Sequence, residues 1–143
     1  MLKTYRVPPS GGKSFLAQKE PELYVDSDVM LEDLGFDGSK KGAEAARESD
    51  DVTLPVIEEY VGEKILLSNF DMTWMTGEPT NQFDQKVLAY RPSEYVEHIE
   101  QVGRDDLLEN FTRTELEQWM YDTNDVDIFL KPGQFISDLI NDL

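Results

Sequence analysis

Apolar positions along the chain fall into short runs that alternate with amphipathic segments. A continuous apolar run at 64–69 turns polar at its end, which is typical of a strand buried on both faces of a parallel sheet. Comparable short runs predict further strands, and apolar residues at helical spacing predict helices between them. The expected strands are 4–7, 23–25, 64–69, 86–90 and 127–130, and the expected helices are 14–19, 39–48, 54–61, 93–102 and 134–143, with a helical turn at 29–34.

Two later segments carry clear local signals. Ser93 is the expected N-cap of the helix 93–102, whose predicted apolar stripe is Tyr95, Val96, Ile99 and Val102. Thr112, with Glu115 three residues later, predicts the start of another helix through a capping box. The side of that helix expected to be buried comprises Leu116, Trp119 and Met120.

The segment 72–85 contains Gly77, Pro79 and Asn81, and it predicts a long loop. Elsewhere strands alternate with helices, which predicts a mostly parallel sheet with right-handed crossovers. The sequence shows no internal repeat and no linker. We therefore expect an α/β fold in which residues 1–143 form a single domain.

Composition narrows the class of protein. The 143 residues include no cysteine, which excludes disulfides and thiolate metal sites, and one histidine, so a zinc site is not expected. No apolar run approaches the roughly 20 residues that span a bilayer. We therefore expect a soluble protein of the cytoplasm that has no membrane partner.

The formal net charge of −17 is the most unusual property of the chain. Such a charge repels phosphate at long range and disfavours general binding to nucleic acid. It fits a solubilising surface, a surface that mimics nucleic-acid phosphates to inhibit a DNA-binding host protein, or an interaction face. Charge alone does not choose among these three.

The most informative motif is Val7-Pro8-Pro9-Ser10-Gly11-Gly12-Lys13-Ser14, which follows the first expected strand and precedes a helix. It fits the phosphate-binding pattern G-x-x-x-x-G-K-[ST] at every fixed position except the first, where Val7 replaces glycine. In such loops glycines let backbone N–H groups approach anionic oxygens closely. A β-branched residue at the first position would strain a turn with positive φ. An ordinary proline-glycine turn is the alternative interpretation.

This motif, followed by a second strand that ends Tyr24-Val25-Asp26-Ser27-Asp28, resembles the P-loop nucleoside, nucleotide and polynucleotide kinases, including small phage-encoded ones. The segment Asp127–Leu130 followed by Gly133–Ile136 also looks like the end of such kinases. The resemblance implies a three-layer P-loop NTPase-like fold with a mostly parallel five-stranded sheet. It also implies ATP and Mg²⁺ as cofactors.

The resemblance assigns roles to individual residues. Residues 9–12 (Pro9, Ser10, Gly11 and Gly12), with Lys13 and Ser14, would bind ATP. Lys13 would neutralise charge during phosphoryl transfer, and Ser14 would ligate Mg²⁺. Asp28 would bind the acceptor and take the proton of its hydroxyl, although it is equally placed to cap the turn 29–34. Because the third strand ends in Ser68-Asn69 rather than in aspartate, Asp26 or Asp71 would supply the metal carboxylate.

Cations are also expected near the transferred phosphoryl group. Arg104 and Arg113 lie where these kinases place a mobile lid, and Arg104 is the expected catalytic arginine. Arg47 and Arg91 are candidates for binding the acceptor, whereas Leu31 stands where the family has an arginine. The alternative for each arginine is a solvated or ion-paired side chain.

Other candidates are weaker. His98 is expected to be a surface or packing residue rather than a catalyst, and Trp74 and Met75 fit either a substrate pocket or the core.

Two functional hypotheses follow. The first is a kinase that phosphorylates a nucleoside, a nucleotide or the 5′-hydroxyl of a nucleic acid. The second is a kinase-fold protein without activity that mimics nucleic acid and inhibits a host protein. A regulatory subunit that only binds the nucleotide is a third and weaker option.

Overall fold

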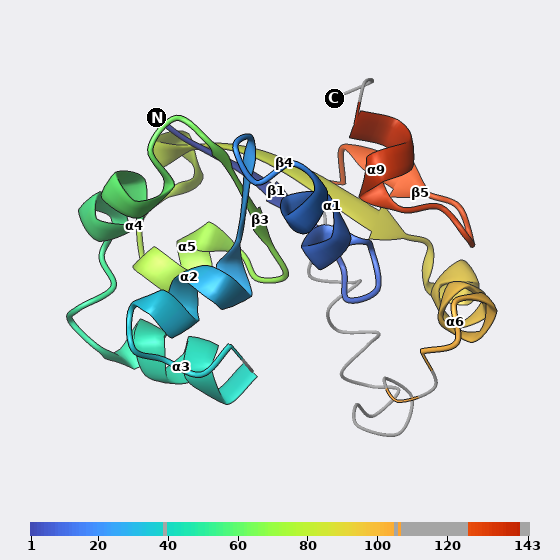
Figure 1. The fold of residues 1–143 in the computed structure, drawn as a ribbon, viewed down its shortest axis with the longest axis horizontal. Helices are drawn as coiled ribbons and strands as arrows, with labels where there is room; N and C mark the ends of the chain where they lie inside the picture. The colour runs from blue at the N-terminus through green and yellow to red at the C-terminus, as the bar shows by residue number, and fades with distance from the viewer. Residues whose placement is uncertain (39, 105, 107–125, 141–143) are drawn as a thin grey trace. The chain divides into compact units, whose positions relative to one another are not determined.

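The computed structural model describes residues 1–38, 40–104, 106 and 126–140, and it shows an α/β protein (Figure 1). Within these residues, five strands form an all-parallel sheet in the order β2-β3-β1-β4-β5. This confirms the predicted α/β class and the parallel sheet, and it is compatible with three layers. The strands are β1 (Leu2–Arg6), β2 (Tyr24–Asp26), β3 (Ile65–Ser68), β4 (Phe83–Tyr90) and β5 (Ile128–Leu130).

The chain divides into two compact units. The first unit comprises Met1–Arg6 and Lys13–Gln85, and the second comprises Val7–Gly12 and Lys86–Leu143. The boundary therefore cuts the motif 7–14 between Gly12 and Lys13. The single-domain organisation expected from the sequence stays a prediction.

In the first unit β3 pairs in parallel with both β1 and β2. Leu66 is the register partner of Thr4 on one side and of Val25 on the other. Leu66 and Leu67 are fully buried, as the continuous apolar run in this segment predicts. The carboxyl ends of the three strands consequently lie at one edge of the sheet.

The helices of the first unit are α1 (Lys13–Lys19), α2 (Ser27–Asp33), α3 (Lys40–Glu48), α4 (Leu54–Val61), α5 (Met72–Thr76) and the 3₁₀ turn η1 (Thr80–Gln82). Helices α2, α3, α4 and α5 contribute to an apolar core together with residues of the strands. Helix α3 contacts both α2 and α5, and the three helices lie together in Figure 1. The core includes Met30 and Leu31 of α2, Ile57 of α4 and Met72 of α5.

The prediction of a long loop at 72–85 is wrong. Residues 72–76 form α5, because the Asp71 carboxylate caps its first turn by accepting the Thr73 N–H at 2.9 Å, and Met72 and Met75 bury their side chains three residues apart. Gly77 ends this helix with a left-handed φ of 74°. Strand β4 then begins at Phe83, three residues earlier than predicted.

The second unit contains most of β4, together with β5, α6 (Pro92–Gln101) and α9 (Ile136–Leu139). Leu88 is the register partner of Ile128, and the Asp127 carboxylate accepts the Val87 N–H at 2.7 Å. Helix α6 begins one residue before the predicted start. Arg91, rather than Ser93, is its N-cap, because Pro92 fits the first helical position and holds the preceding residue extended.

The apolar stripe predicted for α6 is confirmed only in part, because Val102 is the C-cap that follows the helix and is only partly buried. Tyr95 and Ile99 are buried as expected, but Val96 is 38% exposed and His98 takes its place in the interior. Residue 98 lies three positions after Tyr95 and therefore on the same helical face, whereas residue 96 is about 100° away from Tyr95.

Other predictions lie outside the described residues: the helix from Thr112, its buried side and Arg113, and the last three residues of the helix 134–143. Within the described ranges, no helix is long and apolar enough to cross a membrane.

Candidate phosphate-binding site

The side chains expected to handle phosphate and metal meet at the carboxyl edge of the strands in the first unit. Lys13 begins α1, Asp26 is the last residue of β2, and Asp28 lies in the first turn of α2. Ligands of open α/β sheets characteristically bind at this edge. The structure therefore brings together four of the predicted site residues, namely Lys13, Ser14, Asp26 and Asp28.

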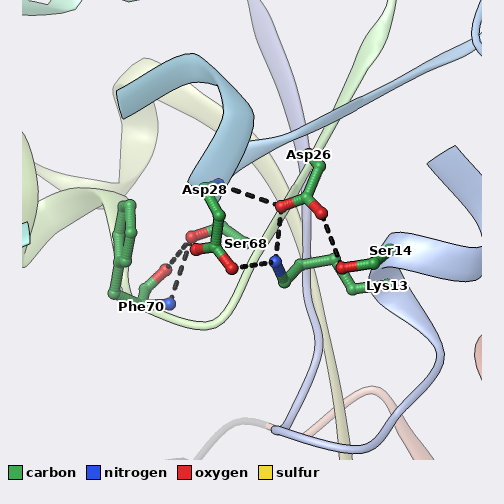
Figure 2. Close-up of polar contacts among 6 residues, drawn as sticks. All are labelled: Lys13, Ser14, Asp26, Asp28, Ser68 and Phe70. Atoms are coloured by element: carbon green, nitrogen blue, oxygen red, sulfur yellow. Dashed lines mark hydrogen bonds and ion pairs between the residues drawn. The ribbon is translucent and has the colours of Figure 1, made fainter. Parts of the chain in front are cut away.

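Lys13 forms ion pairs with two carboxylates (Figure 2). Its Nζ lies 2.5 Å from Asp26 Oδ1 and 3.0 Å from Asp28 Oδ2. The side chains of Lys13 and Asp26 are only 6% and 7% exposed, whereas that of Asp28 is 39% exposed. A buried ammonium is costly without a partner, so Asp26 supplies its buried counterion and Asp28 faces solvent.

Asp26 is the centre of this cluster. Its Oδ2 accepts the Ser14 hydroxyl at 2.7 Å, and its Oδ1 accepts the Asp28 N–H at 2.9 Å (Figure 2). Burial raises the pKa of Asp26, but the charge of Lys13 and the hydrogen bonds from Lys13, Ser14 and the Asp28 N–H outweigh it and lower that pKa below its ordinary value. Asp26 is therefore an ionised carboxylate at neutral pH.

Asp26 also caps α2, which corrects the alternative interpretation of Asp28. The helix begins at Ser27, two residues before the predicted start, and Asp26 has the extended backbone of an N-cap. The Asp28 carboxylate is therefore not the cap of α2, and Lys13 is its ion-pair partner.

Ser14 and Asp26 fit the coordination of Mg²⁺. Their oxygen atoms lie 2.7 Å apart, and both are hard donors. Among the described residues no group of three or more His, Cys, Asp or Glu side chains could hold a metal by itself. This arrangement suits Mg²⁺, which typically binds one or two carboxylates together with water and substrate phosphate.

Asp71, the other predicted metal carboxylate, has different partners. Its Oδ1 accepts the Thr73 hydroxyl at 2.8 Å, and its Oδ2 lies 3.7 Å from Arg6 Nη1. Asp71 therefore stabilises α5 and β1, and Asp26 is the carboxylate available beside Ser14.

At the end of β3, Ser68 closes a local turn. Its hydroxyl donates to the Phe70 carbonyl at 2.9 Å and accepts the Phe70 N–H at 3.1 Å (Figure 2). Such a bond between a serine hydroxyl and a nearby main-chain group fixes the turn after the strand. Ser68 thus has a structural role at the position where the kinases that the sequence resembles have a metal-binding aspartate.

The loop 7–12 belongs to the second unit. The sign of φ alternates along its backbone from Ser10 to Gly12. Ser10 has a φ of 68° and Gly12 a φ of 89°. Val7 is fully buried and is not among the described residues with positive φ, so the predicted strain at Val7 is wrong. The positive φ falls instead on Ser10, where a short polar side chain is tolerated better than a β-branched one.

Both loop glycines are required sterically. A Cβ at Gly11 would lie 2.4 Å from Val7 Cγ1 and 2.9 Å from the Pro8 carbonyl oxygen. A Cβ at Gly12 would lie 2.9 Å from the Cβ of Phe135. The motif glycines thus permit a tight loop, as the sequence pattern predicts.

Three successive carbonyls of the loop accept hydrogen bonds from the rest of the second unit. The Tyr95 hydroxyl donates to the Pro9 carbonyl at 2.6 Å, and His98 Nε2 lies 2.8 Å from the Ser10 carbonyl. The Ile136 N–H donates to the Gly11 carbonyl at 2.8 Å. These contacts could not be predicted from the sequence. The only signal was the position of Tyr95 and His98 on one helical face, and the spacing of more than 80 residues hides their partners.

Each of the three candidate arginines within the described residues has other partners. Arg47 Nε donates to the Trp74 carbonyl at 3.0 Å, and its guanidinium lies 5.0 Å from the centre of the Trp74 ring. Arg91 lies 4.7 Å from the centre of the Phe129 ring. Arg104 is exposed and pairs with Asp106 at 2.9 Å. Their roles toward substrate stay predictions.

Comparison with known proteins adds no further assignment. No protein-family model matches the chain, and no curated protein or solved structure matches it significantly.

Proposed function

We propose that this protein binds a nucleoside triphosphate with Mg²⁺ through residues 9–14 and transfers its terminal phosphoryl group to the hydroxyl of a nucleoside, a nucleotide or a nucleic-acid 5′ end. The observation that carries the proposal is the cluster in which Lys13 pairs with Asp26 and Asp28 while Ser14 donates to Asp26. These are the residue types that phosphoryl transfer needs, at the sheet edge where ligands bind.

Lys13 would bind phosphate by exchanging partners. It shares its charge between two carboxylates, and one of them is partly exposed. A polyphosphate chain offers more negative charge than Asp28 and would draw Nζ towards its β- and γ-oxygens. Asp26 would keep its bond to Ser14, and both would hold the Mg²⁺ that neutralises charge on the phosphates.

Asp28 would act on the acceptor. Once Lys13 turns to phosphate, the Asp28 carboxylate can accept the proton of the acceptor hydroxyl. The hydroxyl oxygen forms a bond to the γ-phosphorus while the bond from that phosphorus to the β,γ-bridging oxygen breaks. The products are the phosphorylated acceptor and the nucleoside diphosphate, with the proton on Asp28.

Calorimetric titration with Mg-ATP tests the proposal. Lys13→Ala should abolish binding, whereas Lys19→Ala, on an exposed lysine in the last turn of the same helix, should leave the dissociation constant unchanged. Thermal unfolding of the unliganded variants shows whether Lys13→Ala remains folded. A folded Lys13→Ala variant that binds Mg-ATP as the wild type does would contradict the proposal.

A further inference from the structure

We infer that Tyr95 and His98 of α6 are positioning residues for the phosphate-binding loop, because their contacts with its carbonyls help to turn the N–H groups of Ser10 and Gly12 towards an anion. The inference deepens the proposed function and rests on it. It concerns residues of the second unit only, and neither side chain touches the substrate.

The geometry of the peptide group links the carbonyl contacts to phosphate binding. In a trans peptide the C=O of one residue and the N–H of the next point in opposite directions. The Pro9 carbonyl points to the Tyr95 hydroxyl, so the Ser10 N–H points away from Tyr95. The Gly11 carbonyl points to the Ile136 N–H, so the Gly12 N–H points away from α9. Two motif N–H groups are thus turned away from the helices that hold the loop.

The third contact stabilises the turn between these two N–H groups. His98 Nε2 lies 2.8 Å from the Ser10 carbonyl, and the next N–H, that of Gly11, donates back to the Pro8 carbonyl at 2.9 Å. The positive φ values of Ser10 and Gly12 flank this turn. When successive residues alternate between right-handed and left-handed backbone conformations, their N–H groups form a concave arrangement that binds anions.

The surroundings of His98 determine its tautomer. Its Nδ1 accepts the Gly133 N–H at 2.9 Å, so the proton of the neutral ring is on Nε2 and donates to Ser10. The ring is fully buried, stacks on Tyr90 at 4.1 Å and meets the edge of Phe135 at 5.4 Å. Burial lowers the pKa of His98, although the hydrogen bond to Ser10 opposes this effect. The lowered pKa keeps the ring neutral. The only histidine of the chain is therefore a fixed neutral donor to the loop.

Tyr90 provides a matched control inside the same cluster. It is fully buried like Tyr95, its ring stacks on that of Tyr95 at 5.4 Å, and its hydroxyl donates to the Gln134 carbonyl at 2.5 Å. Tyr90→Phe and Tyr95→Phe each remove one buried hydroxyl and leave one backbone carbonyl without its donor. Only the carbonyl freed by Tyr95→Phe belongs to the loop.

The experiment measures the dissociation constant of Mg-ATP by calorimetry and the melting temperature of the unliganded protein. Both tyrosine variants should lower the melting temperature by similar amounts. Tyr95→Phe should weaken Mg-ATP binding about tenfold, the effect of one hydrogen bond, and Tyr90→Phe should weaken it less than twofold. His98→Phe, which keeps an aromatic ring, should weaken binding at least as much as Tyr95→Phe. His98→Gln, which retains an N–H donor, should recover part of the loss.

The possible results separate this inference from the proposed function. If the wild type binds Mg-ATP and all four variants bind it equally well, the loop does not need its carbonyl contacts and the positioning role is wrong. Equal weakening by Tyr90→Phe and Tyr95→Phe would also overturn it, because loss of stability would then explain both. If the folded wild type does not bind Mg-ATP, the proposed function fails, and this inference fails with it.

Discussion

The two ends of the motif 7–14 are held by different interactions. Lys13 and Ser14, in the first unit, are held by the carboxylates of Asp26 and Asp28. The loop 7–12, in the second unit, is held through its backbone by an uncharged cluster of Tyr95, His98 and the Ile136 N–H. The difference shows that charge is fixed by opposite charge, whereas backbone shape is fixed by hydrogen bonds to carbonyls and by steric fit. Different substitutions should therefore disrupt the two ends.

The largest expected effect is steric and falls on the loop. Gly12→Ala adds a methyl group 2.9 Å from Phe135 Cβ at a φ of 89°, and it should cost about 4 kcal/mol through overpacking and backbone strain, with loss of Mg-ATP binding. Gly77→Ala is the control, because its φ is 74° and no heavy atom lies within 4 Å of an added Cβ. It should cost only about 1 kcal/mol of strain and leave binding unchanged. Urea unfolding measures the free energy of unfolding of both variants. Equal costs would show that the fit of residue 12 against Phe135 is unimportant.

The next effect is electrostatic and falls on the first unit. Asp26→Asn removes the buried counterion of Lys13 and should lower the free energy of unfolding by about 3 kcal/mol. Asp28→Asn should lower it by less than about 1 kcal/mol, because the Asp28 side chain is 39% exposed and Asp26 still pairs with Lys13. Chemical denaturation measures the free energy of unfolding of both variants. A larger loss for Asp28→Asn would contradict the view that Asp26 is the main partner.

Acidification should affect the uncharged cluster first. Because burial keeps the pKa of His98 in the folded state below its ordinary value of 6.5, the unfolded chain binds the proton first as pH falls. Stability should therefore fall as pH decreases from 6.5, by at most about 1.4 kcal/mol per pH unit, until His98 is protonated in the folded state too. Tyr90 and Tyr95, stacked in the same cluster, do not titrate in this range, because the ordinary pKa of tyrosine is 10.0 and burial raises the pKa of both further.

Denaturation at a series of pH values measures this slope, with His98→Phe as the control. The variant should lack the His98 contribution, and the difference between the two profiles isolates it from the carboxylates. The stabilising contribution of Asp26 is lost only at lower pH, as pH falls below 3.8 and through the lowered pKa of its folded state. Identical profiles for wild type and variant above pH 5 would contradict the assignment of His98 as a buried neutral donor.

The smallest effect on stability is expected at Arg104. Its ion pair with Asp106 is exposed, so Arg104→Ala should change the free energy of unfolding by no more than about 0.5 kcal/mol. The family resemblance implies a catalytic cation at this position. The same variant should therefore lower the rate of phosphoryl transfer about 100-fold, measured with radiolabelled ATP and a panel of nucleosides. An unchanged rate would remove Arg104 from the proposed site.

Local patterns predicted much of the fold and of the charged part of the site. The continuous apolar run around Leu66 predicted a buried parallel strand. The motif 7–14 predicted a tight loop followed by a short helix from Ser14, and the helix begins one residue earlier, at Lys13. Asp26 and Asp28 could be found because they end an apolar run. The capped helix α5 was missed because Gly77 and Pro79 dominate the segment, although Asp71 and the spacing of Met72 and Met75 carried the signal.

The uncharged part of the site could not be predicted in the same way. Tyr95 and His98 donate to loop carbonyls 86 and 88 residues away, and a carbonyl carries no side-chain signature in the sequence. Similarly, the positive φ at Ser10, rather than at Val7, depends on how the loop packs. Charged partners of opposite sign are visible in a sequence, whereas backbone contacts over long distances are not.

A crystal structure of the protein with Mg²⁺ and a non-hydrolysable ATP analogue would show directly whether the motif 7–14 binds phosphate. A polyphosphate should lie against the N–H groups of Ser10 and Gly12, with Lys13 Nζ on its β- and γ-oxygens and Mg²⁺ beside Ser14 and Asp26. A motif 9–14 without phosphate, or a nucleotide bound elsewhere while Lys13 keeps both of its aspartates, would contradict the proposed function.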